Sequence, residues 1–178
     1  LTITNREVRM MFEDMIRDWF SEEDVPYNEF IKAMLSGDVK AMNRYMNTVS
    51  LATFSYFDTA KNSFAENAPE RFYHGFVLGL IVSLKDRYRI VSNRESGRGR
   101  YDIAMYPLKD NEDAFILEFK VRDEKREKNL EETAAIALQQ IEEKGYEADL
   151  LAEGIPKERI YKLGFAFEGK DVLVIETS

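Results

Sequence analysis

Two short stretches rich in aromatic and branched residues constrain the fold of this chain more than any other feature. Residues 100–106 and 115–121 have the composition of β-strands, and the polar segment between them begins with proline. The pattern predicts a β-hairpin centred on Asp110. Because Asp102 lies eight residues before this midpoint and Glu118 eight residues after it, the predicted register places the two carboxylates opposite each other.

The residues around Glu118 add a positive charge to the same face. Side chains alternate along a strand, so Glu118 and Lys120 should point the same way as Asp102. Carboxylate oxygens suit Mg²⁺ or Mn²⁺, and a nearby lysine suits a reaction with an anionic transition state. The alternatives are a solvated acidic pair, which mutual repulsion disfavours, and a simple salt bridge from Lys120 to one of the acids.

Composition limits the possible classes of protein. The chain has 178 residues, 44% of them hydrophobic, which is sufficient for a packed core. It has no cysteine, so disulfides and thiol chemistry are excluded and a cytoplasmic location is expected. We expect no membrane association, because no apolar run is long enough to span a bilayer and no signal peptide is recognisable. Since the chain begins with Leu1 rather than methionine, we expect it to be either a fragment of a longer protein or a trimmed chain.

The charge distribution is uneven. The net charge of −8 argues against a non-specific nucleic-acid binder. Residues 85–100, however, contain six basic and two acidic residues, a net +4, which leaves −12 for the rest of the chain. This basic segment leads directly to Asp102 and could contact phosphate, although ordinary solvated arginines would give the same composition.

The first part of the chain is predicted to be helical. A capping box at Thr4 begins the first helix, Pro26 the second and Asp38 the third, with Gly37 between the last two. Methionine and aromatic residues recur at helical spacing in all three. We interpret these stripes as packing surfaces, either against the following domain or against a segment upstream.

A connection at residues 58–69 precedes a further helix that begins at Pro69. Gly75 and Gly79 would allow this helix to approach a sheet closely, or they are simply tolerated. The remaining pattern predicts, in order, a strand at 88–92, the hairpin, a helix ending at Gly145, a short helix at 147–152, and strands at 159–167 and 172–176. The expected fold is therefore α/β, a mixed central sheet flanked by helices and preceded by a small all-helical region.

This order of elements resembles the PD-(D/E)XK nuclease superfamily, in which a helix with an acid, a strand with Asp, a strand with Glu-x-Lys and a helix with Gln follow one another. Longer sequence motifs resemble those of the C-terminal nuclease-like domain of bacterial AAA-ATPase-like proteins. These motifs are FYHGF at 72–76, SNRESGRGRYD at 92–102, EFKV at 118–121, and QI at 140–141 followed by Lys144 and Tyr146.

The resemblance implies a domain organisation and a partner. Residues 1–57 would be the helical end of an ATPase-like part, and residues 58–178 the nuclease-like domain. An ATPase-like domain of the same protein would lie upstream. No phosphate-binding loop of the Gly-x-x-x-x-Gly-Lys-Ser/Thr type occurs in this sequence, so ATP should not bind here by that route.

The resemblance also implies roles for individual residues. Asp102, Glu118 and Glu70 would bind Mg²⁺ or Mn²⁺, and Lys120 would assist the attacking water or the transition state. Gln140 would lie near the metal-bound water or the substrate strand, unless it is an exposed polar residue of an amphipathic helix. His74, one helical turn after Glu70, would contact substrate or be an ordinary packed histidine.

We expect the surface that contacts the substrate backbone, called the substrate rim below, to lie in the glycine-containing loop before Asp102. Arg94, Arg98 and Arg100 would contact the phosphate backbone of a nucleic acid, with DNA favoured over RNA. Together these features predict a divalent-metal-dependent nuclease that hydrolyses phosphodiesters. The rival interpretation is a catalytically silent nuclease fold that acts as an interaction or regulatory module.

Overall fold

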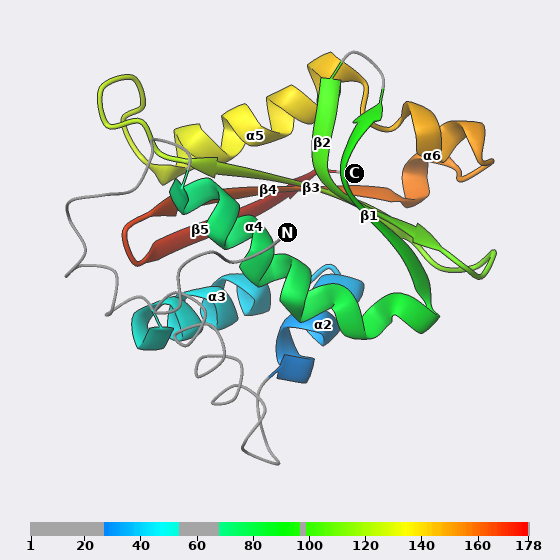
Figure 1. The fold of residues 1–178 in the computed structure, drawn as a ribbon, viewed down its shortest axis with the longest axis horizontal. Coiled ribbons are helices and arrows are strands. Elements are labelled where there is room, and N and C mark those ends of the chain that lie inside the picture. Colours follow the sequence, from blue (N-terminus) through cyan, green and yellow to red (C-terminus); the bar gives the residue numbers. More distant parts are fainter. Residues whose placement is uncertain (1–26, 54–67, 97–98, 178) are drawn as a thin grey trace, which may run out of the picture.

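The computed structural model describes the backbone of residues 27–53, 68–96 and 99–177, and its centre is a five-stranded mixed sheet (Figure 1). The strands lie in the order β1-β2-β3-β4-β5, with β3 and β4 parallel and all other neighbours antiparallel. Their bounds are Tyr88–Ser96, Gly99–Pro107, Ala114–Val121, Ile160–Glu168 and Asp171–Thr177. This arrangement confirms the predicted mixed sheet and the predicted succession along the chain of three strands, a helical segment and two strands.

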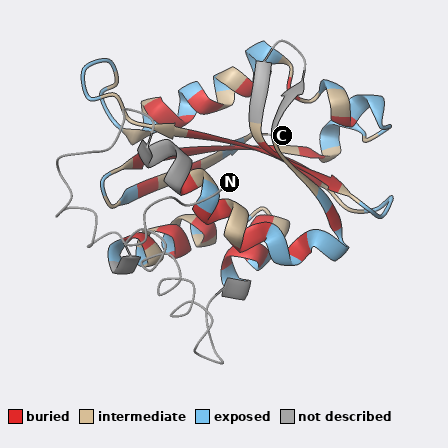
Figure 2. Ribbon diagram, in the orientation of Figure 1, coloured by how far each residue is buried: buried red, intermediate tan, exposed pale blue. Residues whose placement is uncertain are grey.

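Helices cover both faces of the sheet. Helices α2 (Tyr27–Leu35), α3 (Val39–Thr53) and α4 (Ala68–Ile81) lie on one face, and α5 (Leu130–Lys144) and α6 (Ala148–Ala152) on the other (Figure 1). Each layer of helices has its own apolar core against the sheet, and buried residues concentrate on the strands and on the helix sides that face them (Figure 2). Parallel β3 and β4 need a crossover, and α5 and α6 provide it.

The hairpin has the register predicted from the sequence. In β2 and β3, Ile103 pairs with Leu117 and Met105 with Phe115. Continuing this register by one residue places Asp102 opposite Glu118. The alternation of side chains then sends both toward the face covered by α5.

The predicted helix boundaries at Asp38 and Gly145 are confirmed, and the helix predicted to begin at Pro69 begins one residue earlier, at Ala68. The carboxylate of Asp38 accepts a hydrogen bond from the backbone N–H of Ala41 (2.9 Å), which caps the start of α3. Gly145 ends α5 in the left-handed region, at φ 64°, where glycine has no steric cost. The helix predicted from Thr4 lies outside the described residues.

Helix α3 is hydrogen-bonded to the outer edge of β5. The side-chain amide of Asn43 donates to the carbonyl of Val174 (2.8 Å) and accepts from its N–H (2.8 Å). Asn47, one turn later, makes the same pair of bonds with Val172 (2.7 and 3.1 Å). Ser50 continues the series with a bond to the carbonyl of Lys170 (2.5 Å).

Two of the three methionine stripes predicted to be packing surfaces, those of α2 and α3, fall within the described residues and are buried, whereas the stripe of the first predicted helix lies outside them. Met34, Met42 and Met46 share one apolar core with α4 and the sheet. The predicted boundary between residues 57 and 58 falls outside the described residues, and the division into two domains stays a prediction. Among the described helices, none combines the length and apolar character needed to cross a membrane.

Of the two interpretations offered for Gly75 and Gly79 in α4, the structure favours simple tolerance. Among the described residues, a Cβ added at either position would have no neighbour within 4 Å. The glycine that permits close packing is Gly164 in β4, where an added Cβ would lie 2.7 Å from the carbonyl oxygen of Ala134 in α5.

Candidate active site

The strands β2 and β3 hold Asp102 and Glu118 at the point where their paired ladder ends. Beyond the pair Ile103–Leu117, the backbone N–H of Phe119 donates to Oδ2 of Asp102 (2.9 Å). A side chain therefore supplies the hydrogen bond across the two strands at this position. The bond orients the carboxylate of Asp102 and occupies one of its oxygens.

Glu118 is an unusually buried carboxylate, with 2% of its side chain exposed. Its Oε1 accepts hydrogen bonds from Nζ of Lys120 (3.2 Å) and from Nε2 of Gln140. Its Oε2 is buried without a hydrogen-bond partner among the described residues. Since a buried polar atom without a partner is costly, this oxygen is suited to a cation.

Gly164 explains how Gln140 reaches Glu118. Glu118 and Gly164 are paired across β3 and β4, and α5 packs directly on the glycine, close to Ala134 and Leu138. The missing side chain lets α5 approach the strand closely enough for Gln140 to bond to Glu118. The sequence analysis did not identify Gly164, because its signal is a single glycine within a strand.

His74 lies on the face of the sheet covered by α4, opposite the face toward which Glu118 points. Its Nε2 lies 3.0 Å from Oγ of Ser92, and its ring centroid lies 5.7 Å from that of Phe119. Burial raises the pKa of Asp102, and a positive charge on the His74 ring would oppose this increase. Glu70 is in α4 one turn before His74, but its side chain is outside those that the structure describes.

The basic segment divides into two parts. Arg87 forms an ion pair with Glu112 (3.1 Å), and Arg89 with Glu153 (2.5 Å), so both are engaged within the protein. The side chains of Arg94, Arg98 and Arg100 are outside the described set. At the backbone level, Arg94 lies opposite Tyr101 and Glu95 opposite Arg100, which places Arg94 and Arg100 near the end of the β1–β2 hairpin, close to Asp102, whereas Arg98 is outside the described residues.

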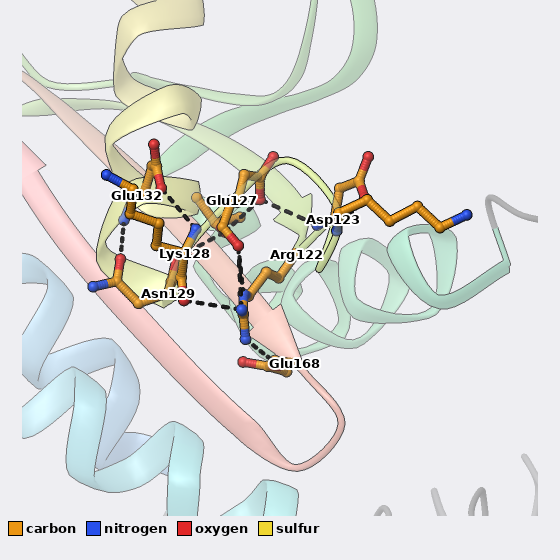
Figure 3. A network of polar contacts seen from close by, with 9 residues as sticks. Arg122, Asp123, Glu127, Lys128, Asn129, Glu132 and Glu168 are labelled. Carbon is orange, nitrogen blue, oxygen red and sulfur yellow. Dashed lines mark hydrogen bonds and ion pairs between the residues drawn. The ribbon is translucent and has the colours of Figure 1, made fainter.

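The β3–α5 connection is held by Arg122 (Figure 3). Its guanidinium donates to the backbone carbonyls of Glu127 (3.1 Å) and Lys128 (2.9 Å), and it forms an ion pair with Glu168. The side chain of Asn129 then caps α5. This network ties the strand that carries Glu118 and Lys120 to the helix that carries Gln140.

Burial dominates the electrostatics of the two acids. It raises the pKa of Glu118 to about 8, with a further increase from the charge of Asp102, while Lys120 opposes the shift. Burial likewise raises the pKa of Asp102, against the lowering effects of the Phe119 amide, His74 and Lys120. Both carboxylates are therefore destabilised as anions in the absence of a compensating positive charge.

This donor set fits a hard divalent cation. Asp102 and Glu118 offer oxygen ligands, and one buried oxygen of Glu118 has no other described partner. Within the described residues no group of three histidine or acidic side chains could bind a metal. The remaining ligands of such a cation can be backbone carbonyls, water or side chains outside the described set.

We expect the metal-free protein to lose thermal stability as the pH rises from about 5 to about 8. Glu118 has an ordinary pKa of 4.5 and a folded-state pKa of about 8, so the folded protein binds the proton more tightly over this interval. Stability is then greatest below the lower pKa and falls until the higher one is passed. Calorimetric melting in EDTA across this range measures the effect.

Glu118→Gln should flatten this pH dependence, because it removes the titrating group. Glu158→Gln is the matched control, since Glu158 is exposed and distant in the fold. If the Glu118 variant keeps the full pH dependence of the wild type, the burial of this carboxylate does not govern stability.

The fold and these residues together define a nuclease-like α/β domain, with two acids and a lysine at the end of a central hairpin. A sequence model of the PD-(D/E)XK nuclease superfamily matches residues 68–177, which is more than half of the chain. The chain therefore belongs to the PD-(D/E)XK nuclease superfamily. No curated protein and no solved structure shows a significant match.

Proposed function

We propose that this chain is a nuclease that depends on Mg²⁺ or Mn²⁺ and hydrolyses nucleic-acid phosphodiesters, with DNA as its substrate. The observation that carries the proposal is the convergence of Asp102, Glu118 and Lys120, together with the buried Oε2 of Glu118. Such an oxygen is costly in a purely structural role and useful in a cation site. Membership of the nuclease superfamily supports the same reaction class.

The residues have separable roles in this proposal. Asp102, Glu118 and Glu70 would hold the cation, which would act as a Lewis acid toward the scissile phosphate. Lys120, with 25% of its side chain exposed, is accessible to substrate and would stabilise negative charge that develops during cleavage. Gln140 would hold Glu118 in place, and His74 would contact the substrate beside Asp102.

The alternative is a catalytically silent module, and the net charge of −8 and the internal pairing of Arg87 and Arg89 favour it. In either case we propose that an ATPase-like domain precedes this one in the same protein. Purified protein should be incubated with circular DNA, linear DNA or RNA, each in Mg²⁺, Mn²⁺ or EDTA. Metal-dependent cleavage of DNA supports the enzyme, whereas no cleavage of any substrate supports the silent module.

The proposed substrate rim leads to a prediction about salt dependence. Replacing both Arg98 and Arg100 with alanine should weaken binding to all DNA sequences alike, because phosphate contacts carry no sequence information. The slope of log affinity against log salt should flatten by roughly one unit for each lost contact. Fluorescence anisotropy with two unrelated duplexes, in Ca²⁺ to prevent cleavage, measures both effects.

A matched control removes the same charge elsewhere. Lys85→Ala combined with Lys109→Ala takes two positive charges from exposed positions at the other end of the β1–β2 hairpin. This variant should keep the wild-type salt slope. Equal slopes for the arginine variant and the wild type would show that the loop is not the substrate rim.

A further inference from the structure

Gln140 uses both hydrogens of its side-chain amide. Its Nε2 donates to Oε1 of Glu118 and also to the phenol oxygen of Tyr146 (3.1 Å). A primary amide has two N–H donors and one carbonyl oxygen, so these two bonds exhaust its donors. The terminal torsion of glutamine is otherwise broad, and two separate anchors restrict it far more than one.

Tyr146 is built into the fold at the end of α5. Its backbone N–H donates to the carbonyl of Ile141 (3.2 Å) immediately after the left-handed Gly145, which closes the helix. Its side chain is 2% exposed and lies in the apolar core that includes Ala104 and Ile116. The phenol is therefore held by main-chain geometry on one side and by packing on the other.

We propose that Tyr146 is a positioning residue for the active site, which acts by fixing the orientation of the Gln140 amide against Glu118. This inference rests on the proposed function and extends it to a residue that touches neither substrate nor cation. Glu118 selects the nitrogen end of the amide, because a carboxylate oxygen repels a carbonyl oxygen. Tyr146 takes the second N–H and so fixes the plane in which the amide lies.

The two hydrogen bonds donated by Gln140 also fix the position of its carbonyl oxygen, which can accept a hydrogen bond. With both N–H groups engaged, the carbonyl oxygen of Gln140 is the part of the amide that can receive a hydrogen bond from another group. If the Tyr146 hydroxyl group were removed, one N–H of the Gln140 amide would lose its acceptor. The amide would then be freer to rotate about its hydrogen bond to Glu118. Glu118 would then lose part of the support that orients it, as partners of metal ligands commonly provide.

The test is a double-mutant cycle in the full chain. Tyr146→Phe should lower kcat for metal-dependent cleavage about tenfold and leave KM within about twofold, because the residue orients a ligand and does not bind substrate. Gln140→Leu should cause an equal or larger loss. The double variant should be no worse than Gln140→Leu alone, because Tyr146 acts through Gln140.

Tyr88→Phe is the matched control. Tyr88 is also 2% exposed, but it packs in the core on the opposite face of the sheet. Removing the hydroxyl group of Tyr88 should leave kcat unchanged. An unchanged kcat in Tyr146→Phe, or losses that multiply in the double variant, would overturn the proposal.

A second measurement separates this inference from the nuclease proposal. The side-chain amide of Gln140, assigned in a ¹⁵N spectrum by its absence in Gln140→Leu, should exchange slowly with solvent in the metal-free wild type. In Tyr146→Phe its exchange should accelerate about tenfold or more, as expected when a partly buried donor loses its partner. If wild-type protein cleaves nothing, this result still supports the positioning role, and an unchanged exchange rate overturns it.

Discussion

Lys120→Ala is expected to reduce metal-dependent cleavage of DNA by about a hundredfold or more. The ammonium group lies 3.2 Å from Glu118 and is partly exposed, so it can reach both the acid cluster and an approaching phosphate. Its removal takes away stabilisation of developing negative charge without removing a metal ligand. Initial rates at saturating DNA and Mn²⁺ measure the loss.

The folded state should survive this change. Lys120→Met, which keeps the aliphatic part of the side chain, should show the same loss of rate and isolates the effect of the charge. Lys40→Ala, at an exposed position of α3 on the other face of the sheet, should cleave like the wild type. A Lys120→Ala protein as active as the wild type would point to a contaminating nuclease or to a different site.

Asp102→Asn should abolish the thermal stabilisation by Mn²⁺ and reduce cleavage by about a thousandfold, since a cation contributes several kcal/mol to such reactions. The substitution is chosen because asparagine can still accept the hydrogen bond from Phe119. The strand geometry should therefore be preserved while the negative charge is lost. Melting temperature with and without millimolar Mn²⁺ reports binding by linkage.

Asp86→Asn is the control for this measurement, because Asp86 is exposed and lies before β1. It should melt at a higher temperature in Mn²⁺, as the wild type should. Two outcomes would contradict the proposed metal site. One is a wild-type protein whose melting temperature and calorimetric heat do not respond to Mn²⁺, and the other is an Asp102→Asn protein that responds fully.

The central hairpin could be predicted because its information is local. The polar turn around Asp110 and the equal spacing of Asp102 and Glu118 determine the register, and Ile103 paired with Leu117 confirms it. Helix ends at Asp38 and Gly145 were predictable for the same reason, since caps depend on neighbouring residues.

The supporting contacts of the site could not be predicted, because they join residues far apart in the sequence. Gly164 matters only because α5 packs on β4, and a glycine in a strand does not reveal its neighbour. For Gly75 and Gly79, residue type alone could not distinguish close packing from simple tolerance, and the structure favours tolerance. The bond from Gln140 to Tyr146 depends on how the chain turns at the end of α5.

The asparagine pairs on β5 have a consequence for association between molecules. An outer strand normally presents bare amides and carbonyls to any other strand, and this is a common route to intermolecular sheets. Here Asn43 and Asn47 saturate these groups at Val174 and Val172, so a foreign strand has nothing to pair with at those positions. Helix α3 thus blocks the pairing of a further strand at Val172 and Val174, two positions on the outer edge of β5.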